Sequence, residues 1–254
     1  MWHYGAGIEV ARRMIVLSET TTSFEERGLS REMIAANAKR LRSLYGMPMR
    51  SEAADRMAAT IQACRAYVGA RTHDPERADL LLRCLRRRAF SDGLLLDESE
   101  TIHAAGTDAG IPAETIDAWL ADERVEAELR QDMTATRAPL PEALALPHRL
   151  ARGDGGLRYS TASAVFEHGE RRVVMPGFQP FAVYEVAVAN VVPDLERRPG
   201  PQNADEILRW TPYPLATAEV AELRAVSLDQ ARDELRHAGA TFSEAAGDGY
   251  WSSA

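Results

Sequence analysis

"LRYSTASAVFEHGERRVVMPGFQPF", residues 157–181, decides the fold, because it predicts two short strands joined by a Gly-containing turn after a long run of helical pattern. An isolated hairpin is marginal in water and needs partner strands. Residues 8–19 are rich in β-favouring side chains and are the obvious partner. We therefore expect residues 8–19 and 160–176 to share one sheet, flanked by a helix over 180–192 and by the helical block.

The composition is that of a globular protein. The 254 residues are 45% hydrophobic and 27% charged, with a net charge of −8. This charge gives no reason to expect binding to nucleic acid or to an anionic membrane. Two cysteines cannot form a disulfide scaffold, no apolar run reaches membrane-spanning length, and the first residues lack a signal-peptide layout. We expect a cytoplasmic, unanchored protein.

The helical block extends over about 30–135. Ser30 is the predicted N-cap of its first helix, which ends at Gly46 and carries an apolar face of Ile34, Ala38, Leu41 and Tyr45. Further helices are predicted over 51–70, 75–93 and 111–133, with Asp97 as the cap of one more.

The last segment, residues 201–254, predicts three helices and then two short strands around "GDG". "LATAEVAEL" followed by "SLDQARDELRHAG" resembles a winged helix-turn-helix. The second of these helices carries three acidic residues against two arginines, so DNA binding is disfavoured. We expect a small packing or protein-interaction module.

The order of strand, helical block, hairpin and helix is that of a thioredoxin-like fold with a large helical insertion. The run "RYSTASAVFEHGERRVVMPGFQPFAVYEVAVAN", with "VLSE", "ACRA" and "LLLDE", resembles DsbA-like thioredoxin-fold proteins. This family includes disulfide oxidoreductases, actinobacterial DsbA relatives, 2-hydroxychromene-2-carboxylate isomerases and kappa-class glutathione transferases. The resemblance implies an α/β, DsbA-type domain over residues 1–195, with the insertion at about 30–135 and the winged-helix-like module after it.

Two departures from the family concern its chemistry. The resemblance implies that the first strand and the C-x-x-C helix of the family are absent from this chain, which begins at what looks like the second strand. The family also places a cis-proline just before the hairpin, where this chain has Ala162. Because a cis peptide bond costs more before alanine than before proline, we expect the usual bend to be disfavoured. By the resemblance, Ser160, Thr161 and Ala162 flank the substrate cleft, although ordinary strand-entry residues explain them equally well.

Other candidate groups indicate little chemistry. Cys64 and Cys84 lie on apolar helix faces, so we expect buried, unpaired thiols. The basic run Arg83, Arg86, Arg87 and Arg88 is more typical of a solvated helix face than of an anion site. The histidines show no metal-ligand spacing. We expect no metal and no cofactor, unless a low-molecular-weight thiol such as glutathione or mycothiol binds.

Three functions stay open. The first is a DsbA-family protein related to thiol-disulfide oxidoreductases and thiol-dependent isomerases that lacks dithiol activity. The second is a non-enzymatic module that binds a protein or a small thiol through the thioredoxin cleft and the last segment. The third, a DNA-binding regulator, is disfavoured by charge. Whether Met1 is the true start, and hence whether the chain is an enzyme, is not decided by the sequence, nor are the substrate and the oligomeric state.

Overall fold

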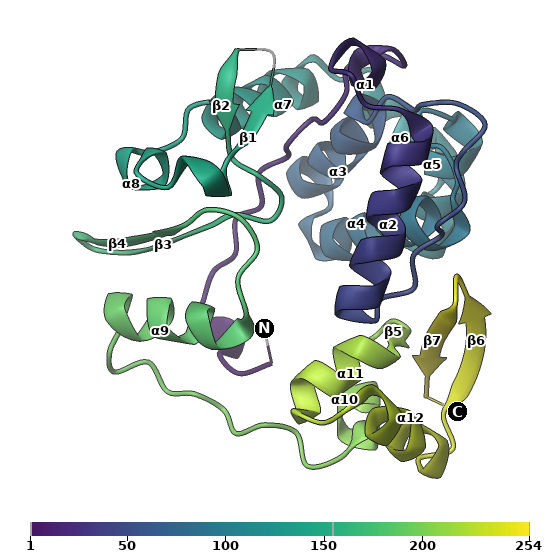
Figure 1. Ribbon diagram of the computed structural model, residues 1–254, viewed down its shortest axis with the longest axis vertical. Helices are drawn as coiled ribbons and strands as arrows, with labels where there is room; N and C mark the ends of the chain where they lie inside the picture. Colours follow the sequence, from purple (N-terminus) through teal and green to yellow (C-terminus); the bar gives the residue numbers. More distant parts are fainter. Residues whose placement is uncertain (1, 154, 254) are drawn as a thin grey trace. The chain divides into compact units, whose positions relative to one another are not determined.

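The computed structural model describes residues 2–153 and 155–253, and most of its regular elements are helices (Figure 1). The chain forms two compact units, each built from two separate stretches of sequence. Unit 1 combines the residues up to 16 with 126–199, and unit 2 combines 17–125 with 200–254. The residues after 200 thus group with the helical block, and the predicted domains over 1–195 and 201–254 stay a prediction.

Unit 1 holds two antiparallel hairpins and the helix α9. Its elements are η1 (Gly5–Gly7), the greater part of α7 (Glu123–Thr136), α8 (Pro141–Leu144), η3 (Pro147–Arg149), β1 (Ala151–Gly153), β2 (Gly156–Arg158), β3 (Ala164–His168), β4 (Arg171–Met175) and α9 (Phe181–Val191). The short β1–β2 hairpin has a Gly-rich turn and was not predicted.

The hairpin predicted around Gly169 is confirmed. β3 and β4 pair antiparallel, with Phe166 opposite Val173. The ring of Phe166 lies 6.2 Å from that of Tyr184 on α9, which packs against both strands. The predicted final helix is thus also confirmed, and it covers one face of the hairpin.

The predicted strand over residues 8–19 is wrong. Among the described residues, the sheet of β3 and β4 has two strands, and residues 8–16 form no strand. The backbone N–H of Met14 donates instead to Oδ2 of Asp132, at 2.9 Å. Further along, the N–H groups of Leu17 and Ser18 donate to the hydroxyl of Thr60. Side-chain oxygens thus accept the hydrogen bonds that a neighbouring strand was expected to receive.

Unit 2 contains the helical block. Its elements are α1 (Ser23–Glu26), α2 (Arg31–Tyr45), α3 (Ile61–His73), α4 (Pro75–Arg87), the π-helical turn η2 (Arg88–Asp92), α5 (Ser99–Asp108), α6 (Ala113–Leu120) and the start of α7. The predicted limits of α2 are confirmed: Ser30 caps its first turn, and Gly46 ends it in a left-handed conformation.

Several helix predictions in the block are wrong. The helix expected from residue 51 begins only at Ile61, and the long helix expected over 111–133 is two helices, α6 and α7. Asp97 does not cap α5. Its carboxylate accepts hydrogen bonds from Arg56 and from the backbone of Ala59, and so joins two loops. Of the apolar face predicted for α2, Ala38 and Leu41 are partly buried, and Ile34 and Tyr45 are exposed.

Close packing in the block depends on a glycine. A Cβ atom at Gly69 of α3 would lie 2.6 Å from Cβ of Trp119 on α6. No side chain fits there, because the helices approach too closely for a methyl group. Trp119 is buried, and its ring stacks on that of His73.

The last segment forms its own small core. Its elements are α10 (Ala204–Trp210), β5 (Leu215–Ala216), α11 (Thr217–Arg224), α12 (Leu228–His237), β6 (Thr241–Ala245) and β7 (Asp248–Ser252), with the strand order β5-β7-β6. The predicted helices and final strands are confirmed, and β5 is an addition. Ile207, Val220 and Leu235 are fully buried at the centre. We call this segment, residues 204–252, the C-terminal module.

None of the helices in the described part of the chain has the length and apolar character needed to cross a membrane.

Candidate functional site

The residues that the resemblance assigned to a cleft lie in a tethered loop of unit 1. Oγ of Ser160 donates to the carbonyl of Arg149 at 2.6 Å, and Oγ of Ser163 donates to the carbonyl of Ser160 at 2.7 Å. Oγ of Ser163 also accepts from the N–H of Gly177, at 2.9 Å. Three segments, before β1, before β3 and after β4, are thereby held together. We call residues 160–163 the tethered loop.

The backbone bend expected to be disfavoured at Ala162 is present. The peptide bond between Thr161 and Ala162 is cis, although the second residue is alanine. Both residues are exposed. Within residues 2–153 and 155–253, the peptide groups of these two residues make no hydrogen bond. They are therefore available to an external ligand.

Gly177 permits the tether. Its φ is +72°, and a Cβ atom there would lie 3.2 Å from the carbonyl oxygen of Arg149 and 3.3 Å from Oγ of Ser160. Sequence reasoning missed Gly177, Ser163 and Arg149 as parts of this site. The Pro–Gly pair directly after the second strand was the one local signal.

The base of the loop is fixed to α7. The N–H of Tyr159, which is buried, donates to the carbonyl of Thr136, and its hydroxyl accepts from the N–H of Leu140. Beside the loop, the side chain of Phe178 is 52% exposed. The loop is thus a firmly held, exposed stretch of backbone with an aromatic neighbour.

The two cysteines belong to unit 2, whereas the tethered loop belongs to unit 1. The prediction that both are buried is wrong, because Cys64 and Cys84 are each partly exposed; they form no disulfide with each other. Burial raises the pKa of the Cys84 thiol, and Asp108 adds to this effect, against the lowering effect of Arg87, Arg88 and Arg83. Cys84 is therefore mostly a protonated thiol near neutral pH.

Three arginines of the basic run, Arg83, Arg87 and Arg88, are partly buried and engaged within unit 2, so the expectation of a solvated face is wrong for them; Arg86 is exposed. The Arg83 guanidinium donates to both carboxylate oxygens of Glu219, at 2.7 and 2.6 Å, and lies over the ring of Tyr213. Arg88 pairs with Asp108 at 2.7 Å.

Arg87 lies over the ring of Tyr250, whose hydroxyl is 2.7 Å from Oγ of Ser91. These contacts attach the C-terminal module to α4 and η2. Arg83, Arg87 and Arg88 therefore hold parts of unit 2 together and do not form an open anion site.

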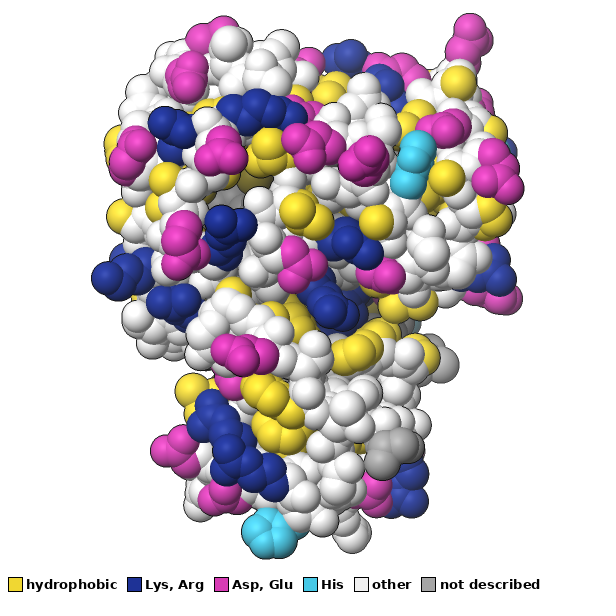
Figure 2. All heavy atoms as spheres, turned by 90° about the vertical axis from the view of Figure 1, so that its right-hand side faces the viewer, with side chains coloured by type: hydrophobic (Ala, Val, Ile, Leu, Met, Phe, Trp, Pro, Cys, Tyr) yellow, Lys and Arg dark blue, Asp and Glu magenta, His cyan; other side chains and the backbone are white. Residues whose placement is uncertain are grey.

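The charges of α12 are also paired. Arg232 lies 2.9 Å from Asp229 and 3.4 Å from Asp248, and Arg236 lies 3.3 Å from Asp233. On the face drawn in Figure 2, acidic and basic side chains are interspersed. This pattern does not favour a phosphate backbone.

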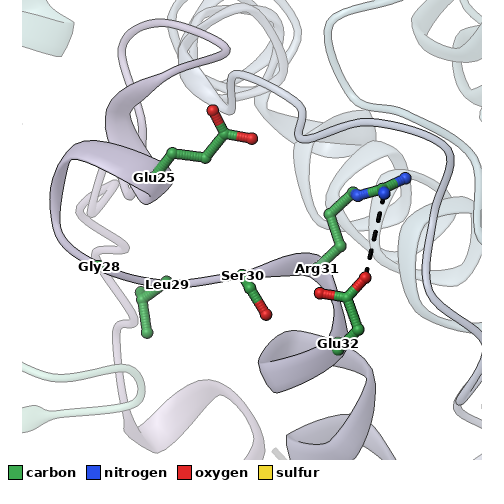
Figure 3. A pocket seen from close by; sticks show the side chains of 6 residues that line it. All are labelled: Glu25, Gly28, Leu29, Ser30, Arg31 and Glu32. Atoms are coloured by element: carbon green, nitrogen blue, oxygen red, sulfur yellow. Dashed lines mark ion pairs between the residues drawn. The ribbon is translucent and has the colours of Figure 1, made fainter.

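A shallow depression of about 390 Å³ lies at the start of α2 (Figure 3). The polar side chains of Ser30, Arg31 and Glu32 are engaged, and that of Glu25 also lines the depression. Oγ of Ser30 accepts from Met33, Arg31 donates to the carbonyls of Ala54 and Asp55, and Glu32 lies 3.9 Å from Arg31. The depression is a helix-capping site and brings no reactive groups together. Among the described residues, no cluster of three or more histidine, cysteine or acidic side chains could hold a metal ion.

Comparison with known proteins identifies one family. The model of the DSBA-like thioredoxin domain matches residues 6–138, which is more than half of the chain. The match includes the N-terminal segment and the helical block, and it ends before the hairpin. No curated protein matches the sequence.

Solved structures add a distant likeness. The chain is 16% identical to a protein described as "a putative protein disulfide isomerase" from Nitrosomonas europaea, with a TM-score of 0.49 over 63% of this chain and 74% of that one. None of these matches includes evidence for a winged-helix module, which stays a prediction.

Proposed function

This chain belongs to the DSBA-like thioredoxin domain family, and from that premise we propose that it binds an extended partner polypeptide at the tethered loop and does not exchange disulfides through its own cysteines. The observation that carries the proposal is the pair of exposed, unbonded peptide groups at Thr161 and Ala162. Extended polypeptides bind such groups by adding main-chain hydrogen bonds at an exposed edge.

The hydroxyl tethers support this proposal. Ser160 and Ser163 use their hydroxyl groups within the protein, so the loop offers mainly backbone groups, beside the hydroxyl of Thr161. A backbone held in place loses little freedom when a ligand binds, which favours affinity. Because main-chain hydrogen bonds do not involve the ligand's side chains, we expect the binding affinity to depend only weakly on the ligand's sequence.

The state of the cysteines argues against thiol exchange by this chain. Exchange needs an accessible thiolate, and the pKa of Cys84 is raised. Neither Cys64 nor Cys84 has a second cysteine three positions away, so neither matches the C-x-x-C arrangement of the family. In our proposal, this chain therefore shares polypeptide binding with the related oxidoreductases and isomerases, but not their thiol chemistry.

The C-terminal module is, in our proposal, a winged-helix-like packing element. Its order of helix, strand, two helices and two strands supports the likeness. Its contacts with α4 through Glu219 and Tyr250 support a structural role, and the paired charges of α12 argue against DNA.

The binding proposal is tested by titrating the ¹⁵N-labelled protein with reduced, carboxymethylated insulin B chain, a permanently extended polypeptide. We expect the amide signals of Thr161 and Ala162 to shift. Ser163→Ala removes two loop tethers and should weaken binding about fivefold, the effect of roughly one hydrogen bond. Ser243→Ala, an exposed serine on β6, is the matched control and should bind normally.

A parallel titration with glutathione distinguishes a small thiol ligand from a polypeptide. The purified chain should not reduce insulin above the glutathione background. Shifts confined to other regions would contradict the binding proposal, and turnover that disappears in Cys84→Ser would contradict the exclusion of thiol exchange.

A further inference from the structure

The residues at the start of unit 1 are fastened to the segment that follows α9, and we call residues 2–7 the N-terminal strap. The side chain of Trp2 is buried, and its indole N–H donates to the carbonyl of Pro199 at 2.9 Å. The guanidinium carbon of Arg198 lies over the same indole ring, 3.9 Å from the ring centroid. The strap is thus held against residues 195–199 within unit 1.

His3 makes the central contacts of the strap. It is the one buried histidine among the described residues. Its carbonyl accepts a hydrogen bond from the N–H of Arg198 at 2.7 Å, and its Nδ1 lies 3.0 Å from the carbonyl oxygen of Arg198. Because a carbonyl oxygen can only accept, Nδ1 carries a proton in this contact. Two reciprocal hydrogen bonds therefore join the strap to Arg198.

The second ring nitrogen of His3 faces a cation. Nε2 lies 3.5 Å from Nη2 of Arg197. Since a guanidinium group only donates, Nε2 must accept in this contact and carries no proton. Glu185 of α9 accepts from Nε of the same guanidinium, which holds Arg197 in this position. The strap is therefore built around one neutral form of His3, with its proton on Nδ1.

The surroundings of the His3 ring do not favour a second proton. No carboxylate in the described part of the chain is bonded to this ring. The charged groups beside it are Arg197 and Arg198, and Glu185 is linked to it only through Arg197. The ring of Phe181 on α9 lies 5.2 Å from the His3 ring, between centroids. A protonated ring would gain a weak cation–π attraction there, but the repulsion between two adjacent cations is the larger effect.

We propose that the strap is a pH-sensitive clasp, which opens when His3 takes up a proton on Nε2. This proton removes the acceptor that faces Arg197 and sets two donors and two positive charges against each other. Histidine side chains generally gain their second proton between about pH 8 and about pH 5. Opening releases residues 2–7 and uncovers the rings of Trp2 and Phe181, so mild acid adds apolar surface to unit 1. This device does not depend on the binding proposed for the tethered loop.

Hydrogen exchange of the full chain measures the opening, because the N–H of Arg198 is bonded to the strap. Its protection factor should fall at least about fivefold between about pH 7.5 and about pH 5, the effect of roughly one lost hydrogen bond. The protection of the Trp2 indole N–H should fall in parallel. The N–H of Tyr159, which donates to the carbonyl of Thr136 in the same unit, is the internal reference and should keep its protection.

Two substitutions separate this clasp from a general loosening in acid. His3→Asn keeps a side-chain N–H for the Arg198 carbonyl but cannot take up the proton, and Arg197→Met removes the cation that the proton would face. In both variants, the protection factor of Arg198 should stay nearly constant between the two pH values, whatever its absolute size. The controls His148→Asn and Arg171→Met replace exposed side chains of the same two kinds, and they should show the full fall.

A protection factor of Arg198 that is the same at both pH values in the wild-type chain would overturn the proposal. An equal fall at Tyr159 would overturn it as well, since unit 1 as a whole would then loosen in acid. A fall that persists in His3→Asn would assign the pH response to another group and would equally contradict the clasp.

Discussion

Arg83 on α4 donates to both carboxylate oxygens of Glu219, and the same carboxylate accepts from the N–H of Ala216 and so caps the start of α11. Arg83 also donates to the carbonyl of Pro214. One half-buried ion pair therefore fixes a helix start and joins two parts of unit 2 that are far apart in sequence.

Arg83→Ala should destabilise the protein by about 2 kcal/mol, since it leaves the Glu219 carboxylate and the Pro214 carbonyl without a charged partner. Denaturant unfolding followed by fluorescence and by circular dichroism measures this cost. Arg86→Ala is the control, because Arg86 is exposed on the same helix, and its cost should stay within about 0.5 kcal/mol. If the two variants lost the same free energy of unfolding, the ion pair of Arg83 and Glu219 would contribute no more to stability than an exposed arginine does.

Cys84 should react slowly in the native protein. In a Cys64→Ser background, iodoacetamide should alkylate native Cys84 more slowly than the unfolded chain at pH 8, because its pKa is raised and less thiolate is present. The native rate should continue to rise above the ordinary thiol pKa of about 8.5. Fast native labelling at pH 7 would instead indicate an activated thiol.

The same shift has a consequence for stability. Above the ordinary thiol pKa, the unfolded chain ionises at Cys84 before the folded chain does, so the free energy of unfolding should fall as the pH rises. This alkaline fall should be smaller in Cys84→Ala.

Glu234 should contribute to stability at neutral pH and not in acid. Its hydrogen bonds with Arg224, at 2.8 and 3.0 Å, lower its pKa. The contribution is complete above the ordinary glutamate pKa of about 4.3 and is lost as the pH falls through the lower, folded value. Unfolding curves of wild type and Glu234→Gln should therefore differ at pH 7 and converge near pH 2. A constant difference across this range would contradict the assignment.

Two glycines allow a matched test of the tethered loop. Gly169 and Gly177 both have a positive φ, but only Gly177 is crowded by neighbouring atoms. Gly169→Ala should cost about 1 kcal/mol for the backbone conformation alone. Gly177→Ala should cost about 2 kcal/mol more, because its methyl group meets the Arg149 carbonyl. Thermal unfolding compares the two. Similar costs would mean that the segments around the loop adjust easily.

Local signals predicted much of the fold. The cap at Ser30, the glycine at Gly46 and the hairpin turn at Gly169 each act on residues a few positions away. Residues 8–16 were predicted as a strand, but the backbone of Met14 bonds to Asp132, which is 118 positions away in the sequence. A β-favouring run does not reveal whether a strand or a carboxylate will accept its hydrogen bonds.

For the candidate site, the resemblance named Ser160, Thr161 and Ala162 as residues of a cleft, and this role stays a prediction. The structure places these consecutive residues in the tethered loop, with Thr161 and Ala162 exposed. Their tethers to Arg149 and Gly177 come from other loops, and sequence spacing carries no signal for them. The exposure of Cys84 was missed because apolar periodicity places a residue on a face but not at the edge of that face.

The division of each unit into two stretches affects the protein while it is being made. At about 5–20 residues per second, the ribosome needs on the order of 10 s to pass from residue 16 to the segment that completes unit 1. The hydrogen bond of Met14 can therefore form only after Asp132 has been synthesised. The ion pair of Arg83 has a longer delay, because Glu219 is further along the chain from Arg83 than Asp132 is from Met14. A nascent chain halted after residue 199 would have neither a complete unit 2 nor an acceptor for that guanidinium, which makes such a chain a natural client for chaperones.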